Sequence, residues 1–326
     1  MNIVKFKYKI IIISSIFLLL GIIFGISISN KTCNVYKLKY IDPNLNCSEN
    51  PIVKKSSYIQ LKHDLEEYIQ IGKDKKAVTD VSIYFRDLSN GPTLGINEHS
   101  TFSPASLLKL PLLLAYENMK NENSPDIFSK KITAETTWTI PEQVIPPANS
   151  ITLGNVYSID KMLSYMIQYS DNNSYYVLLD YLHKNYTERD ILKDTFVSLG
   201  IVDPKDFLED TISVKSYGSI FTQLYYSSYF NKKETSDEVL EMLTKTDWSN
   251  GINMGVPANI KVAHKFGERV NIEGNLSQLH DCGIVYYPGN PYLLCIMTRG
   301  DDLTKLSKVI GVISGMVYDE FNSRKL

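Results

Sequence analysis

Hydrophobic residues recur along the chain at two spacings, and these predict where its helices and strands lie. Helical spacing predicts helices over residues 57–71, 107–116, 162–179 and 303–317, and a further one beginning near Val214. Alternation of apolar and polar residues, or short apolar runs, predicts strands over 81–85, 93–96, 260–266, 282–287 and 292–298. Because strands stand at both ends and helices lie between them, we expect one α/β (α+β) unit whose antiparallel sheet is completed by pairing the two ends.

The first 30 residues have the pattern of a membrane anchor or signal segment. Three lysines precede an uncharged apolar run over residues 10–28, and a helix of that length spans about 28 Å, close to the roughly 30 Å hydrocarbon core. The lysines should stay in the cytoplasm, which places the rest of the chain outside. Ser27 and Ser29 are small residues at which a signal peptidase could cut, so a cleaved, secreted form is the alternative. Residues 31–56 are polar without periodicity and are expected to form an extracytoplasmic stalk.

An extracytoplasmic location would permit disulfides, although four cysteines are too few for a disulfide scaffold. If residues 282–295 form a hairpin centred between Pro288 and Gly289, Cys282 and Cys295 lie directly opposite each other, and a disulfide becomes geometrically possible. Two small apolar strand residues are the equally supported alternative. Cys33 and Cys47 flank a short polar segment and could close a small loop.

Charge and composition narrow the classes of partner. The 326 residues include 34 Lys and Arg against 36 Asp and Glu, a net charge of −2, so we expect no nucleic-acid partner. The hydrophobic content of 44% is that of an ordinary globular protein rather than a disordered chain.

Ser106 and Lys109 are the first candidate catalytic residues. They stand three positions apart at the start of the apolar helix, so both lie on one face. A lysine in a desolvated position can lose its proton near neutral pH and act as a base toward a serine hydroxyl. The same spacing occurs at Ser158 and Lys161, where Ser158 is better interpreted as a helix N-cap.

Two further polar clusters accompany this pair. Ser170-Asp171-Asn172 interrupts the apolar pattern over 162–179, and buried polar residues without partners are costly. Lys265-Phe266-Gly267 ends a predicted strand, where a glycine suits a substrate lying along the strand edge.

The order Ser-x-x-Lys, Ser-Asp-Asn and Lys-[Thr]-Gly resembles the class A β-lactamase-like and penicillin-binding serine hydrolases of the D,D-peptidase superfamily. The resemblance covers residues 57–326 and implies a catalytic domain with the β-lactamase/transpeptidase fold, an antiparallel sheet flanked by helices plus an all-α region. It implies that Ser106 is acylated, Lys109 is the general base, and Ser170 relays a proton to the leaving nitrogen. Lys265 would attract a substrate carboxylate and tune Ser170.

The same resemblance implies three substrate-binding groups and no cofactor. Asn172 would bind a substrate amide, and the oxyanion hole would be formed by the N–H groups of Ser106 and of Glu268, which follows Gly267. The implied substrate is a β-lactam or a peptidoglycan stem peptide. No metal is expected, because His280, Asp281 and Cys282 are consecutive on a predicted strand and cannot all face one ion.

Two departures from the family pattern bear on turnover. Phe266 replaces the usual hydroxyl residue of the third motif, and its side chain is expected either at the site or in the core. The glutamate motif that activates the hydrolytic water in class A enzymes is missing from the short segment 201–210. Glu209 and Asp210 are the possible substitutes, although solvated loop acids are the more ordinary interpretation.

The sequence therefore predicts a β-lactamase-like hydrolase with an extracytoplasmic catalytic domain on a bacterial cell membrane. A penicillin-inhibited D,D-carboxypeptidase or transpeptidase is the alternative, and a wall- or lactam-binding module without turnover is a third. Arg269 and Arg299 are equal candidates to contact a substrate carboxylate, whereas His264 is expected in the core or behind the site. Glu268 and Glu273 are expected as acids at the rim of the site.

Overall fold

The computed structural model describes residues 38–43, 45, 58–89, 91–122, 124–201, 210–270 and 276–324. Contacts within the chain define a large unit of residues 40–42 and 52–326, and a second unit of residues 1–39 and 43–51. The apolar run over 10–28 and the pair Cys33 and Cys47 lie outside the described residues. Among the residues that are described, no helix is both long and apolar enough to cross a bilayer.

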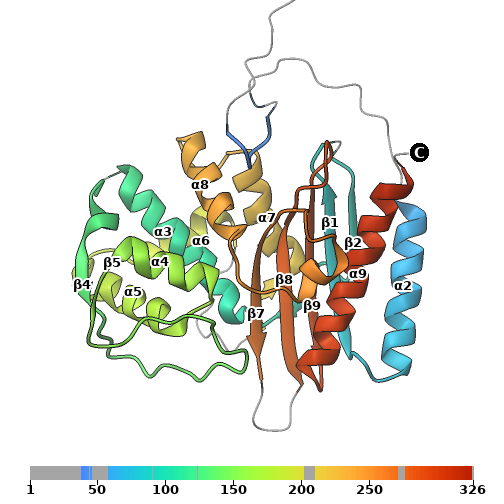
Figure 1. Ribbon diagram of the computed structural model, residues 1–326, viewed down its shortest axis with the longest axis horizontal. Coiled ribbons are helices and arrows are strands. Elements are labelled where there is room, and N and C mark those ends of the chain that lie inside the picture. The colour runs from blue at the N-terminus through green and yellow to red at the C-terminus, as the bar shows by residue number, and fades with distance from the viewer. Residues whose placement is uncertain are drawn as a thin grey trace, which may run out of the picture. The chain divides into compact units, whose positions relative to one another are not determined.

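The large unit is built on a five-stranded antiparallel sheet of order β2-β1-β9-β8-β7 (Figure 1). Its strands are β1 (Asp80–Asp87), β2 (Thr93–Ile96), β7 (Val262–Arg269), β8 (Ser277–Val285) and β9 (Tyr292–Gly300). Strand β1 pairs with β9, with Ile83 opposite Ile296, so the prediction that the two ends of the domain complete one sheet is confirmed. β7 is an edge strand, which leaves one side of its backbone available to other groups.

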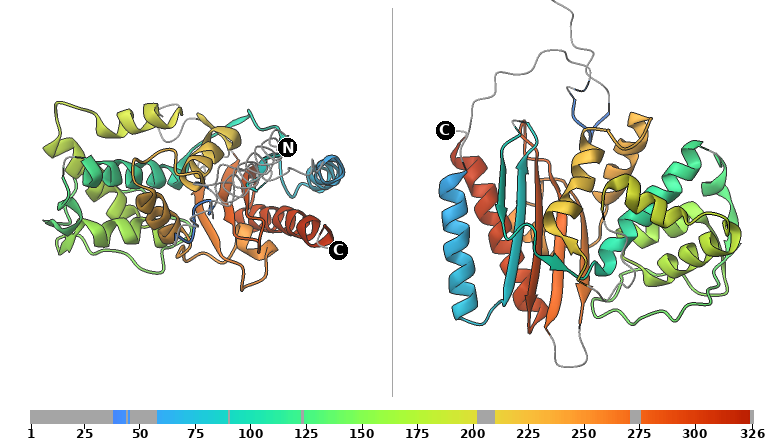
Figure 2. Two further views of the ribbon diagram at one scale, coloured as in Figure 1. Left: turned by 90° about the horizontal axis from the view of Figure 1, so that it is seen from above. Right: turned by 180° about the vertical axis from the view of Figure 1, so that it is seen from behind.

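Alternating side chains along β1 attach helices to both faces of the sheet. Ile83 and Phe85 are fully buried in the core with residues of α2 (Ile59–Asp74) and α9 (Leu303–Ser323). On the opposite face, Tyr84 packs on α7 (Val214–Tyr225), where a Cβ on Gly218 would come within 2.9 Å of its ring. The views in Figure 2 show α2 and α9 together on one side of the sheet.

A mainly helical region beside β7 completes the unit and carries the Ser106 segment (Figure 1). Its helices are α3 (Lys109–Glu122), α4 (Ile159–Gln168), α5 (Asn172–Asn185), α6 (Ile191–Leu199) and α8 (Lys233–Leu243). Short 3-10 turns form η1 (Ala105–Leu108), η2 (Ile127–Ser129) and η3 (Gly251–Gly255). Two small antiparallel pairs join β3 (Thr101–Phe102) to β6 (Ile212–Ser213), and β4 (Lys131–Thr133) to β5 (Val156–Ser158).

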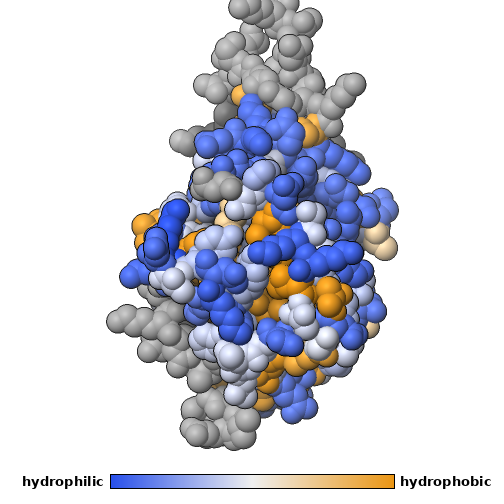
Figure 3. Space-filling view, turned by 90° about the vertical axis from the view of Figure 1, so that its left-hand side faces the viewer, coloured by the Kyte–Doolittle hydropathy of each residue, from blue (hydrophilic) through white to orange (hydrophobic). Residues whose placement is uncertain are grey.

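The surface of this helical end is mostly hydrophilic, with apolar residues showing between the polar ones (Figure 3). Several apolar side chains there are more than two-fifths exposed, among them Val156 on β5 and Val197 on α6. Single exposed apolar residues are common on soluble proteins and indicate no binding site by themselves.

The prediction of one helix over 162–179 is wrong, because the chain breaks into α4 and α5 at residues 169–171. Ser170 has the left-handed backbone angle φ +56°, which reverses the chain. Asp171 then caps α5, since its carboxylate accepts the N–H groups of Asn173 and Ser174. The predicted N-cap role of Ser158 is confirmed, because its Oγ accepts a hydrogen bond from the Lys161 N–H at 3.2 Å.

Two findings concern the hairpin and the expected stalk. Cys282 and Cys295 stand opposite each other on β8 and β9 and form a disulfide, which decides between the two alternatives left by the sequence. Within the segment expected to be a stalk, residues 40–42 belong to the large unit. The Tyr40 carbonyl accepts the Tyr286 hydroxyl at 2.9 Å, and Asp42 donates its N–H to the Tyr225 carbonyl.

Candidate active site

Ser106 lies in the 3-10 turn η1, where the chain enters α3 beside strand β7. Ala105 directly before it has φ +45°, a left-handed value that is unfavourable for alanine and often found next to functional residues. A Cβ on Gly267 would lie 3.1 Å from the Leu107 nitrogen, so only glycine lets β7 approach the serine turn this closely.

The Lys109 side chain is the centre of the buried polar cluster. Its Nζ lies 2.7 Å from Ser106 Oγ, 2.8 Å from the Ser170 carbonyl oxygen and 2.7 Å from Asn172 Oδ1. Burial lowers the pKa of Lys109 to about 7, against the opposing effect of the Asp171 and Glu268 carboxylates. When neutral, the amine can donate to the carbonyl and to the amide oxygen while its lone pair accepts from the Ser106 hydroxyl.

Ser170 Oγ lies between two lysines. Lys265 Nζ donates to it at 2.9 Å, and Lys109 Nζ lies 3.3 Å from it. Lys265 is fully buried, and desolvation, followed by the nearby Lys109, lowers its pKa well below the ordinary value. The structure therefore brings together the four predicted catalytic side chains, and a proton can pass along hydrogen bonds from Ser106 to Ser170.

Hydrogen bonds from the connection between β4 and β5 hold Asn172 in place. Its Nδ2 donates to the Pro141 carbonyl oxygen at 3.0 Å, while its Oδ1 faces Lys109. Gln143 of the same connection donates to the Ser170 carbonyl and accepts the Asn172 N–H, both at 3.0 Å. Sequence reasoning missed Gln143, and no signal could have found it because it stands in an irregular proline-rich segment far from the motifs.

The backbone of Glu268 faces the free edge of β7. The Thr246 hydroxyl donates to the His264 carbonyl from that edge. Because the N–H and C=O of every second residue in an antiparallel strand point to the same side, the Glu268 N–H has the same direction. The Glu268 side chain crosses to the connection, where it accepts the Ile145 N–H at 2.8 Å, and burial raises its pKa.

Asp210, one of the two predicted substitutes for the missing loop glutamate, does not join this cluster. Glu209 lies outside the described residues, as does Glu273. Asp210 accepts hydrogen bonds from Gln278 at 2.9 Å and from Arg299 at 2.7 Å. Arg299 also donates to the Thr101 carbonyl, so its guanidinium group is held against the segment before η1.

The two buried histidines form hydrogen bonds with residues around the cluster. His264 is 1% exposed and bonds Asp281 Oδ1 through Nδ1 at 2.8 Å, in agreement with its expected place in the core. His280 bonds the Ser103 carbonyl at 3.0 Å, and burial lowers its pKa to about 3, so the ring is a neutral donor there. Across the described residues, no group of three His, Cys, Asp or Glu side chains is placed to hold a metal ion.

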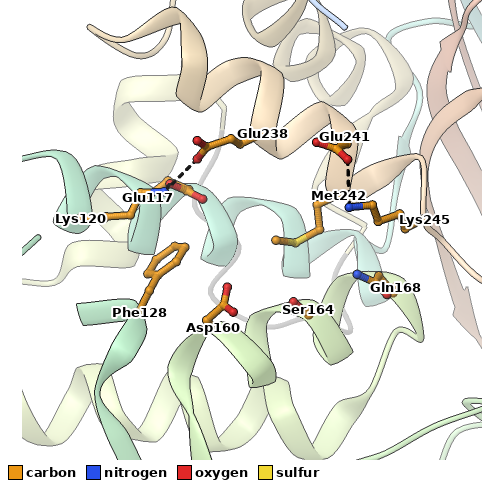
Figure 4. A pocket seen from close by; sticks show the side chains of 10 residues that line it. All are labelled: Glu117, Lys120, Phe128, Asp160, Ser164, Gln168, Glu238, Glu241, Met242 and Lys245. Atoms are coloured by element: carbon orange, nitrogen blue, oxygen red, sulfur yellow. Dashed lines mark hydrogen bonds and ion pairs between the residues drawn. The ribbon is translucent and has the colours of Figure 1, made fainter. Parts of the chain in front are cut away.

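A separate hollow of about 290 Å³ lies between α3, α4 and α8 (Figure 4). Ion pairs hold its walls together: Lys120 pairs with Glu117 at 2.6 Å and with Glu238 at 3.1 Å. None of the residues around it belongs to the Ser106 cluster.

Comparison with known proteins identifies the family of this chain. The model of the β-lactamase enzyme family matches residues 60–321. A β-lactamase of Bacteroides uniformis is 23% identical over 269 residues, covering 75% of this chain and 86% of the relative. β-Lactamase VEB-1 of Pseudomonas aeruginosa is 23% identical over 263 residues, covering 76% and 87%.

Solved structures share the fold at lower identity. A PBP-A variant in an acyl-enzyme complex with penicillin G has a TM-score of 0.67 at 20% identity, covering 81% of this chain and 97% of that one. A β-lactamase from Chitinophaga pinensis has a TM-score of 0.67 at 19% identity, covering 80% and 99%. Because the family model spans most of the sequence and the fold agrees with it, this chain belongs to the β-lactamase enzyme family.

Proposed function

We propose that the protein is a β-lactamase-like serine hydrolase that forms an acyl-enzyme on Ser106 and then hydrolyses it. The observation that carries this proposal is the 2.7 Å contact between Ser106 Oγ and a buried lysine amine whose pKa is lowered to about 7. A neutral amine at that distance is a base within reach of the serine proton.

The proposed acylation moves one proton and exchanges one bond. Lys109 takes the Ser106 proton while Oγ bonds the carbonyl carbon of the lactam, and the resulting oxyanion accepts the N–H groups of Ser106 and Glu268. The carbon–nitrogen bond then breaks as the nitrogen takes a proton from Ser170. Ser170 then receives a proton through Lys109. Lys265 donates a hydrogen bond to Ser170 Oγ and stabilises the negative charge on that oxygen during the transfer.

Hydrolysis of the acyl-enzyme needs a base that activates water. Asp210 is held by Gln278 and Arg299, which argues against it as that base. Losing a general base slows a reaction by about 10²–10⁴. This observation favours a second candidate function, a penicillin-inhibited D,D-carboxypeptidase or transpeptidase acting on peptidoglycan stem peptides. If the acyl-enzyme is not hydrolysed at all, the protein is a lactam- or wall-binding module without turnover.

We propose a division of the chain that suits either function. Residues 1–30 anchor it in the cytoplasmic membrane through the 10–28 run, or are cleaved. Residues 31–56 form a stalk except for residues 40–42, which belong to the large unit, and residues 57–326 are the extracytoplasmic catalytic domain. Alkaline extraction of membranes tests the anchor, since a single-pass protein stays in the pellet and a cleaved protein appears in the medium.

The function is tested by mixing the full-length protein with a fluorescent penicillin and a chromogenic cephalosporin. Rapid colour release with transient labelling supports the hydrolase, and persistent labelling with little colour supports the peptidase. Ser106→Ala should abolish labelling, whereas Ser158→Ala, in the second serine–lysine pair of equal spacing, should not. Labelling that survives Ser106→Ala contradicts the proposed nucleophile.

A further inference from the structure

The strand beside Ser106 presents different chemistry on its two faces. Lys265 points to Ser170, so the alternation of a strand directs Phe266 and Glu268 to the other face. Phe266 is 4% exposed, and its ring stacks on Trp248 with 4.3 Å between centroids. Its side chain is therefore in the core, and this position of the strand presents no hydroxyl to a substrate.

Glu268 adds an acid where a substrate would lie. Its backbone N–H points to the free edge of β7, so a carbonyl attacked by Ser106 and held by that N–H sits within a few ångströms of the Glu268 side chain. The carboxylate is held by the Ile145 N–H at 2.8 Å, so it cannot turn freely into solvent. A substrate group that follows β7 toward the connection meets this carboxylate.

The cations nearby have other partners. Lys109 and Lys265 bind the two serines, and Lys265 also donates to the Phe266 carbonyl at 2.8 Å. Arg299 pairs with Asp210 and Asp80. Arg269 follows Glu268 on β7, so its side chain leaves the strand on the Lys265 face and not beside the Glu268 carboxylate.

We infer that Glu268, on a strand where Phe266 leaves no hydroxyl, makes this site select acyl donors that carry no negative charge on the leaving-group side. This inference rests on the proposed acylation of Ser106. Two like charges about 6 Å apart at an effective dielectric constant near 20 weaken binding by roughly a hundredfold, and partial solvation reduces this to about tenfold. The penalty applies to a free carboxylate and disappears when that group is an ester or an amide.

The probes are penicillin G and its methyl ester, which carry the same acyl group and differ in one charge. Acylation of the full-length protein is followed by intact-protein mass spectrometry, and the second-order rate constants are compared. We expect the ester to acylate Ser106 about tenfold faster than the free acid. Glu268→Gln should bring the ester-to-acid ratio close to one, whereas Glu142→Gln, an exposed acid on the same connection, should leave both rates unchanged.

The outcomes separate this inference from the function on which it rests. If both compounds label Ser106 but the acid is as fast as the ester, or the ratio is the same in Glu268→Gln, the assignment to Glu268 is wrong and the acylation mechanism stands. If neither compound labels the folded protein, the acylation proposal fails and this inference fails with it.

Discussion

The protonation of Lys109 gives the sharpest test of the site, because in the proposed mechanism its burial sets the pH range in which Ser106 should become reactive. Moving the pKa from 10.5 to about 7 corresponds to about 5 kcal/mol against the charged amine, at about 1.36 kcal/mol per unit. A base works only when unprotonated. The neutral fraction of a group with pKa 7 is about one-tenth at pH 6, one-half at pH 7 and nine-tenths at pH 8.

The acylation rate should therefore rise about tenfold between pH 6 and pH 8 and then level off. The assay is the initial rate of labelling by a fluorescent penicillin across this range, with fold checked by circular dichroism at each pH. Lys109→Arg keeps a positive charge that is not lost below pH 12, so its rate should fall by about 10²–10⁴.

Lys161 supplies the matched control. It stands three residues after Ser158 at the start of α4, and Lys161→Arg should leave both the rate and its pH profile unchanged. A rate that keeps rising toward pH 10, or that falls from pH 6 to pH 8, would show that a neutral Lys109 is not the base and would refute this reasoning.

Three further predictions concern packing and stability. Gly267→Ala places a Cβ 3.1 Å from the Leu107 backbone, so β7 must move by a few tenths of an ångström and labelling should slow by about tenfold. His280 has a pKa of about 3 when folded, so the free energy of unfolding should fall as the pH drops from 6.5 toward 3, by up to about 5 kcal/mol, and His280→Gln should reduce this slope in urea titrations. Reducing the Cys282–Cys295 disulfide frees a loop with a sequence separation of 13 and should cost about 3 kcal/mol in thermal or urea unfolding.

Each of these has a control within the chain. Gly315→Ala in α9, where a Cβ meets no atom closer than 3.8 Å and the backbone is helical, should leave labelling unchanged. His99→Gln removes a histidine whose side chain is 76% exposed, and an equal loss of slope in that variant would contradict the role given to His280. A Cys282→Ser and Cys295→Ser double variant that unfolds at the same urea concentration as the oxidised protein would contradict the stabilising effect of the disulfide.

The alternation of apolar and polar residues, together with the turn residues, was enough to predict the strands of the sheet. Residues 81–85 alternate, and the turn at Pro288-Gly289 sets the register that places Cys282 opposite Cys295. These are short-range patterns, since the face of each strand and the reversal at each turn follow from a few neighbouring residues. The break between α4 and α5 was missed because it depends on the left-handed Ser170 and the capping Asp171, and both residues also occur inside helices.

The candidate catalytic residues could be named from the sequence, because Ser106, Lys109, Ser170 and Lys265 stand in motifs with local spacing and order. Only the tertiary structure shows that these side chains lie together. It alone also shows that Gln143 accepts the Asn172 N–H and that Ile145 donates its N–H to Glu268. The physical reason is that desolvation and hydrogen bonding come from groups far apart in sequence. The low pKa of Lys109 arises from its burial against Ser170 and Asn172, which lie far from it in the sequence, so no single stretch of the chain encodes it.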